Sequence, residues 1–385
     1  MLKKILIFTT QGGHGHRASA QALSAAIKAQ NLPWTVIQAD FFATLQNTDN
    51  HSHLWAKLSQ KMTVIYNTLI QCSWGRGILA FLSKVFIPPY KKFLENKIIN
   101  QITNQGANHP FITYLQEQKP DLVISVASLI NTCLGQIMAQ FFPQIPVAVI
   151  ATDFDEGFPG MWLGPDQLHY LLGTDLLQIK AKNQGYTHTY PLPGLMINPS
   201  FCVPTNQDKK NYKKRLGLHP DKPTALILFG GYGDSLMLRV AKKVANHPSL
   251  QCIFICGHNH SLYEDLKKIP FQNPSCIAGF TDTMVDYMQA ADFFIGKPGP
   301  GCVSEAISQY LPVLIQTGWT TLLQEKAVVD WVQRRTLGLT FYGLNDLLIK
   351  IEKMLENLEF YTNHTKKIPP NTAVFESLTI LQKFM

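Results

Sequence analysis

Short apolar runs alternate with stretches of helical periodicity along most of the chain. In the first half the runs are KILIFTT, WTVIQAD, DLVISVA and VAVIAT, at residues 4–10, 34–40, 121–127 and 147–152. Apolar runs separated by helical segments are typical of a mostly parallel sheet with helices on its faces. We therefore expect an α/β fold.

The same pattern restarts after a polar, proline-containing stretch at residues 198–212, which we interpret as a linker. The later runs are TALILFGG, QCIFICG, SCIAGF, DFFIGKPGPG and LPVLIQT. We predict two Rossmann-like, doubly wound domains at 1–200 and 201–365, and a helix within 366–385 that packs back on the first. Two such domains would face a central cleft, because open parallel sheets bind ligands beyond the carboxyl ends of their strands.

Composition narrows the class of protein. The chain has 385 residues, 46% of them hydrophobic, which is enough for more than one core. We see no signal peptide and no apolar window of membrane-spanning length. The seven cysteines are an odd number and lack the spacing of a disulfide framework, which indicates a reducing compartment. We therefore expect a cytoplasmic protein. Cys252, Cys256, His258 and His260 resemble a zinc site only weakly, because no second ligand pair follows.

The first glycine turn, GGHGHRASAQAL at 12–23, allows two interpretations. Gly13, Gly15 and Ala18 satisfy G-x-G-x-x-A after a strand, with Asp40 near the place of a ribose-binding acid, so a nicotinamide enzyme is one. In the other interpretation the turn carries a general base, His16, because a neutral imidazole at a strand-to-helix turn can accept a proton near neutral pH.

Two turns in the second half predict a phosphate site. FGGYGDS places Gly231 and Gly233 between a strand and a helix, where backbone N–H groups can approach phosphate oxygens. GKPGPGCVSEAI places Gly299 and Gly301 before a helix that we expect to begin near Cys302. Glu305 would then lie in the first turn of this helix. There its carboxylate would either accept hydrogen bonds from a ribose diol or only complement the helix dipole.

These motifs, with GFTDTMVDYMQAADFFIGKPGPGCVSEAI and TLLQEKAVV, resemble the GT-B nucleotide-sugar glycosyltransferases of family 28, of the MurG and monogalactosyldiacylglycerol synthase type. HRASA is closer to the diacylglycerol glycosyltransferase branch. The resemblance implies inverting transfer of a hexose from a UDP-sugar to a lipid such as diacylglycerol. It requires no cofactor and no metal.

The resemblance also implies roles for individual residues. His16 matches a proposed general base, Glu305 the acid on the donor ribose, and Phe280 the position whose backbone binds uracil. Gln324 and Glu325 match a pair near the donor sugar and phosphates. The remaining matches are glycines that face the donor, at Gly15, Gly231, Gly233, Gly299 and Gly301.

The departures from the family pattern lie in the first half. His14 replaces a glycine, SVAS replaces a histidine-proline pair, and Phe158 replaces a histidine. TDFD forms a D-x-D pair from Asp153 and Asp155, which would hold a metal in another transferase fold. We expect no metal. We expect Asp153 to have either a structural role or a contact with the acceptor, and the proton of the acceptor hydroxyl to be removed by His16 alone or by His16 with Asp153.

Residues 54–105 carry seven basic residues and one acid, Glu95, among many aromatics. With a net charge of +8, this predicts contact with an anionic membrane surface on the cytosolic side, or else an ordinary helical hairpin. Nucleic acid fits less well, because no RNA or DNA motif is present. The alternative functions are a MurG-like transferase acting on a polyprenyl-linked saccharide and a non-catalytic nucleotide-sugar or lipid-binding protein.

Overall fold

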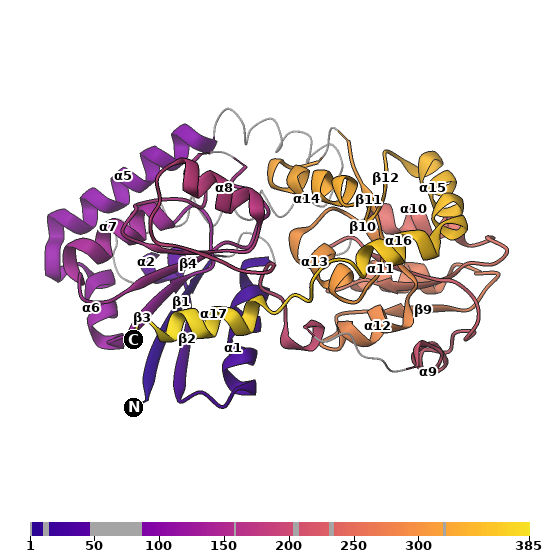
Figure 1. Ribbon diagram of the computed structural model, residues 1–385, viewed down its shortest axis with the longest axis horizontal. Coiled ribbons are helices and arrows are strands. Elements are labelled where there is room, and N and C mark those ends of the chain that lie inside the picture. The colour runs from indigo at the N-terminus through magenta and orange to yellow at the C-terminus, as the bar shows by residue number, and fades with distance from the viewer. Residues whose placement is uncertain are drawn as a thin grey trace. The chain divides into compact units, whose positions relative to one another are not determined.

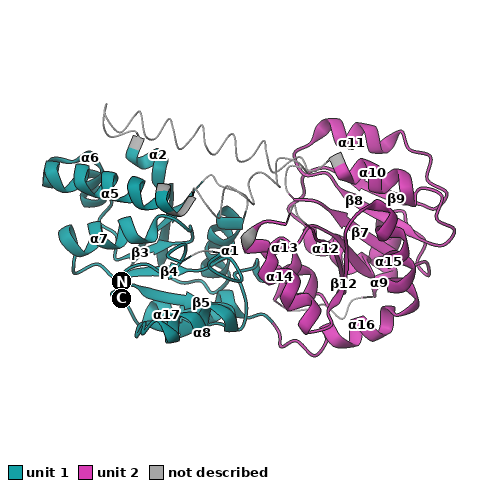
Figure 2. Ribbon diagram, turned by 90° about the horizontal axis from the view of Figure 1, so that it is seen from above, with its two compact units in different colours: residues 1–68, 78–199, 371–385 teal, residues 69–77, 200–370 magenta. Residues whose placement is uncertain are grey.

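The computed structural model describes residues 2–10, 15–46, 87–157, 159–202, 208–230, 235–318 and 321–385. The chain forms two compact units (Figure 2). Unit 1 contains the described residues up to Pro199 together with Asn371–Met385, and unit 2 contains those of Ser200–Pro370.

Unit 1 is built on a six-stranded sheet with the order β2-β1-β3-β4-β5-β6, in which all neighbours are parallel. Its strands are β1 (Lys3–Thr9), β2 (Trp34–Asp40), β3 (Leu122–Ser125), β4 (Val147–Ile150), β5 (His169–Leu172) and β6 (Thr189–Pro191). Its helices are α1 (Gly15–Ala29), α2 (Phe41–Gln46), α5 (Ile87–Gln105), α6 (Pro110–Gln118), α7 (Asn131–Phe141), α8 (Asp175–Asn183) and α17 (Ala373–Gln382), with a 3-10 turn at Gly106–Asn108.

Unit 2 repeats this architecture with the strand order β12-β11-β10-β7-β8-β9, again parallel throughout. Its strands are β7 (Thr224–Leu228), β8 (Gln251–Ile255), β9 (Ser275–Ala278), β10 (Phe293–Gly296), β11 (Val313–Gln316) and β12 (Gly338–Phe341). Its helices are α9 (Lys209–Arg215), α10 (Ser235–Val244), α11 (His260–Lys267), α12 (Met284–Ala290), α13 (Pro300–Ser308), α14 (Leu323–Arg334), α15 (Leu344–Glu356) and α16 (Leu358–Thr365), after a 3-10 turn at Pro199–Phe201.

The predicted α/β class and doubly wound halves are confirmed. The central strands are continuous apolar runs because helices cover both faces of each sheet: every residue of β3, β4, β7, β8 and β10 is buried. Each unit has its own core, with Trp162 and Tyr170 among the buried side chains of unit 1 and Phe254 and Phe293 among those of unit 2.

The carboxyl end of β2 shows what Asp40 does. Its Oδ1 accepts the backbone N–H of Ala43 at 2.7 Å, which caps the start of α2. This capping role accounts for Asp40 without any bound ribose. Of the two features that favoured a nicotinamide enzyme, only the G-x-G-x-x-A match then remains.

The last helix, α17, belongs to unit 1 and packs beside α1 (Figure 1). Lys3 Nζ donates to the backbone carbonyl of Met385 at 3.1 Å, and the Phe384 ring stacks on His169 with centroids 4.1 Å apart. The two ends of the chain are thus joined within one unit.

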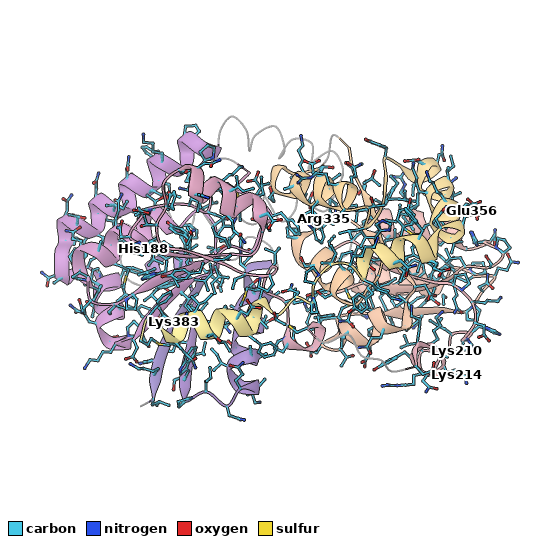
Figure 3. All side chains as sticks on the ribbon, in the orientation of Figure 1. His188, Lys210, Lys214, Arg335, Glu356 and Lys383 are labelled. Carbon is cyan, nitrogen blue, oxygen red and sulfur yellow. The ribbon has the colours of Figure 1, made fainter. Side chains whose placement is uncertain are left out.

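Part of the positive charge is structural. In α9, Lys210 and Lys214 extend into solvent (Figure 3), whereas Lys213 is buried and donates to Asp292 Oδ2 at 2.7 Å. In α5, Lys91 turns inward to Glu95 Oε1 at 2.8 Å, so it does not contribute to the predicted membrane face. Within the described part of the chain, no helix combines the length and apolarity needed to cross a bilayer.

Candidate active site

His16 lies in the first turn of α1 and is held from two other loops of unit 1. Its Nδ1 lies 3.2 Å from Thr152 Oγ1, just after β4, and the backbone of Val126, just after β3, also hydrogen-bonds the ring. Parallel pairing places the ends of β1, β3 and β4 at one edge of the sheet, so residues far apart in sequence meet there.

Burial lowers the pKa of His16 to about 4, because a charged imidazole is poorly solvated there, and the Val126 bond opposes this only in part. His16 is therefore neutral at pH 7. A neutral ring can accept a hydrogen bond or a proton from a hydroxyl group.

The predicted pair His16 and Asp153 meets through a residue that the sequence did not single out. Trp162 Nε1 donates to Asp153 Oδ2 at 3.0 Å, and the His16 ring packs edge-on against the same indole with centroids 5.8 Å apart. Asp155 turns elsewhere and pairs with Lys180. The D-x-D carboxylates thus have separate partners, and the described residues contain no cluster of three potential His, Cys, Asp or Glu metal ligands.

An apolar pocket of about 70 Å³ adjoins this cluster. Leu129, in its wall, donates its backbone N–H to the Met161 carbonyl at 3.0 Å, and Lys91 Nζ lies 3.9 Å from where a Cβ on Gly160 would be. The pocket is therefore lined in part by the loop after β3, one of the two loops that hold His16. It is lined by Phe41, Phe42, Lys91, Leu94, Glu95, Ile98, Leu129, Ile130 and Cys133.

In unit 2, two strand ends form a candidate phosphate site. Gly230, after β7, has φ +83°, and a Cβ there would lie 3.1 Å from Lys297 Nζ, which follows β10. Leu228 and Gly296 are paired in the register of these strands, so the glycine turn and the lysine come together at one edge. Gly299 is the N-cap of α13, and a Cβ on Gly301 would meet no described atom within 4 Å.

The expected start of the following helix was wrong. α13 begins at Pro300, which is favourable at a first helical position, and not near Cys302. Glu305 therefore lies beyond the first turn, where it does little for the helix dipole. Burial raises its pKa to about 7, and its charge also acts on the neighbouring Cys302 thiol.

The other predicted residues of unit 2 have contrasting environments. Phe280 is 60% exposed and stacks on His258 with ring centroids 4.3 Å apart. The sequence did not predict this contact, because the two residues are far apart along the chain. Glu325 is buried, and its Oε2 accepts the backbone N–H of Leu322 at 3.1 Å, so one oxygen is used to cap α14. Gln324, beside it, is half-buried.

Five residues named from the sequence lie outside the described residues: Gly13, His14, Phe158, Gly231 and Gly233. Gly15, at the start of α1, is described and exposed, and a Cβ there would meet no atom of the described residues within 4 Å.

Comparison with known proteins shows what the chain is similar to. A family model described as monogalactosyldiacylglycerol (MGDG) synthase matches residues 16–190, the part that carries His16, Asp153 and Trp162. This part of the chain is thus similar to monogalactosyldiacylglycerol synthases. The match agrees with the resemblance that the sequence motifs carry.

Curated relatives extend the match into unit 2. A probable chloroplastic monogalactosyldiacylglycerol synthase of Glycine max is 27% identical, over 81% of this chain and 58% of its own length. A processive diacylglycerol beta-glucosyltransferase of Staphylococcus saprophyticus is also 27% identical, over 81% of this chain and 75% of its own. The matched region thus spans less than two thirds of the plant protein.

Solved structures share the fold. MurG of Acinetobacter baumannii is 13% identical with a TM-score of 0.57, covering 99% of both chains. The structure of MnaA with UDP from S. aureus is 15% identical with a TM-score of 0.56, covering 99% of this chain and 95% of the other. The predicted GT-B fold is confirmed.

His16 should titrate with a pKa near 4 in the folded protein, followed by NMR of its imidazole, and near 6.5 in urea. Since only the unfolded chain takes up this proton between pH 6.5 and 4, His16 should lower the free energy of unfolding as pH falls through that window. A folded-state pKa near 6.5 would contradict the buried environment described for the ring.

Proposed function

We propose that the protein transfers a hexose from a UDP-sugar to a neutral lipid, diacylglycerol, with inversion at the anomeric carbon. The observation that carries the proposal is His16, a neutral imidazole, together with the loop after β3, which hydrogen-bonds the ring through Val126 and lines an apolar pocket through Leu129 and Ile130. A hydroxyl group on an apolar body suits this combination. The relatives named as acting on diacylglycerol support this choice of acceptor.

The donor would bind unit 2. The Lys297 ammonium group, the Gly230 turn and the N-terminus of α13 supply positive potential for a diphosphate, whose charge grows as it leaves. Because these groups belong to the chain, we propose that transfer needs no metal. Glu305 would accept hydrogen bonds from the ribose diol, and the exposed ring of Phe280 lies at the same edge for the base.

The acceptor would approach unit 1 from a membrane. Lys92 and Lys97 are exposed on α5 on either side of Phe93, which is 55% exposed. Basic and aromatic side chains on one helix face favour an anionic bilayer surface. On the opposite side of α5, Leu94 and Ile98 line the pocket, so one helix would link membrane contact with acceptor binding. We propose peripheral binding to the cytosolic face.

The reaction is tested by UDP release from each UDP-sugar in turn, with and without vesicles of diacylglycerol and anionic lipid. Release should require one sugar together with the vesicles. His16→Ala should lower kcat about 100-fold or more while keeping affinity for UDP, because only proton removal from the acceptor is lost. His188→Ala, an exposed histidine of the same unit, is the matched control.

Two results would contradict this proposal. Measurable UDP binding without release from any sugar would point to a non-catalytic binding protein. Release that requires a polyprenyl-linked saccharide in the vesicles, and not diacylglycerol, would point to the MurG-like reaction.

Glu305 makes uridine binding dependent on pH. If its carboxylate accepts the ribose hydroxyls, protonation below pH 7 weakens binding, and affinity at pH 6 should be about tenfold lower than at pH 8. Uridine is the probe because it has no phosphate that titrates in this range. Glu305→Gln should bind weakly at both values, and a wild-type affinity that is constant from pH 6 to 8 would refute the assignment.

A further inference from the structure

Trp162 is the point where the acceptor-side residues meet. It is completely buried, its indole N–H donates to Asp153, and its ring makes an edge-type contact with the His16 ring. Its backbone carbonyl accepts a hydrogen bond from Asn131 Nδ2 at 2.9 Å. The orientation of this one side chain therefore affects both proposed catalytic groups.

The loop that leads to Trp162 is organised around a buried carboxylate. Glu156 is 2% exposed, and its Oε1 accepts the backbone N–H groups of Gly160, Trp162 and Leu163 at 3.2, 3.4 and 3.0 Å. Three donors converging on one anionic oxygen compensate the cost of burying its charge.

Asp155, the acid next to Glu156, has a different role. Asp155 pairs with Lys180, whereas Glu156 has no ion-pair partner among the residues that the structure describes. Its charge is held by the loop itself. The backbone conformation of residues 160–163 and the carboxylate thus depend on each other.

We propose that Glu156 is a positioning residue, which fixes the backbone of residues 160–163 so that Trp162 orients Asp153 and His16. This inference rests on the proposed function, because it assigns a purpose to the orientation of those two side chains. Glu156 touches neither of them in the contacts described, so its effect on transfer passes through Trp162.

The far end of the loop is anchored without Glu156. The backbone N–H of Gly164 donates to Tyr170 Oη at 2.8 Å, and Tyr186 Oη donates to the Gly164 carbonyl at 2.6 Å. A Cβ on Gly164 would also lie only 3.2 Å from the backbone nitrogen of Thr132, so this end is tightly packed. We therefore expect Glu156→Gln to fold, with the change confined to residues 156–163.

The test that does not depend on turnover is the indole N–H signal of Trp162 in a proton–nitrogen NMR spectrum, assigned by its loss in Trp162→Phe. In Glu156→Gln a neutral oxygen replaces the anionic acceptor, so the signal should shift or broaden as the bond to Asp153 changes. Glu117→Gln, the same substitution at an exposed site of unit 1, should leave it unchanged. Glu156→Asp, which keeps the charge but shortens the side chain, serves if the glutamine variant does not fold.

Kinetics separate positioning from general loss of structure. Glu156→Gln should lower kcat about tenfold and leave KM for the UDP-sugar unchanged, since the donor residues belong to unit 2. The double variant with Trp162→Phe should be no slower than Trp162→Phe alone, because both act through one side chain. An unmoved indole signal, or additive losses in the double variant, would overturn the proposal.

The proposed function can fail separately. If wild-type protein transfers no sugar under any condition, the transferase proposal is wrong, while the indole signal still reports whether Glu156 positions Trp162.

Discussion

Parallel pairing of neighbouring strands is the constraint on which both candidate sites depend. In unit 1 it places the ends of β1, β3 and β4 side by side, so that His16 meets Val126 and Thr152 across more than 100 residues of sequence. In unit 2 the register of β7 with β10 brings Gly230 to Lys297. Without this common edge, neither the imidazole nor the lysine would have its surroundings.

Burial shifts the pKa values of His16 in unit 1 and Glu305 in unit 2 in opposite directions. Burial lowers the pKa of His16 and keeps a base neutral, whereas burial raises the pKa of Glu305 and brings an acid close to half ionisation at pH 7. The physical cause is the same, since both sites disfavour charge. A low-polarity site also strengthens the effect of the few charges that remain, such as Lys297, which we propose to lie beside the leaving diphosphate.

The sequence sufficed for features that repeat or that lie next to a strand. Apolar runs and glycine turns predicted the α/β class and the place of His16 after a strand, because strand ends are local in sequence, whereas the predicted place of Glu305 in the first turn of α13 was wrong. It could not place Trp162 between His16 and Asp153, since that contact depends on a loop folded around Glu156. It also could not show that Lys91 turns inward or that His258 stacks on Phe280, because both depend on tertiary packing.

The central claim, that the donor binds unit 2 while His16 serves the acceptor in unit 1, is tested most directly by hydrogen exchange with and without UDP. The account predicts that UDP slows exchange of backbone N–H groups at residues 228–230 and 297–305, and leaves residues 126–131 and 156–164 unchanged. Protection centred on the unit 1 segments, with none at the edge of β7 and β10, would contradict it.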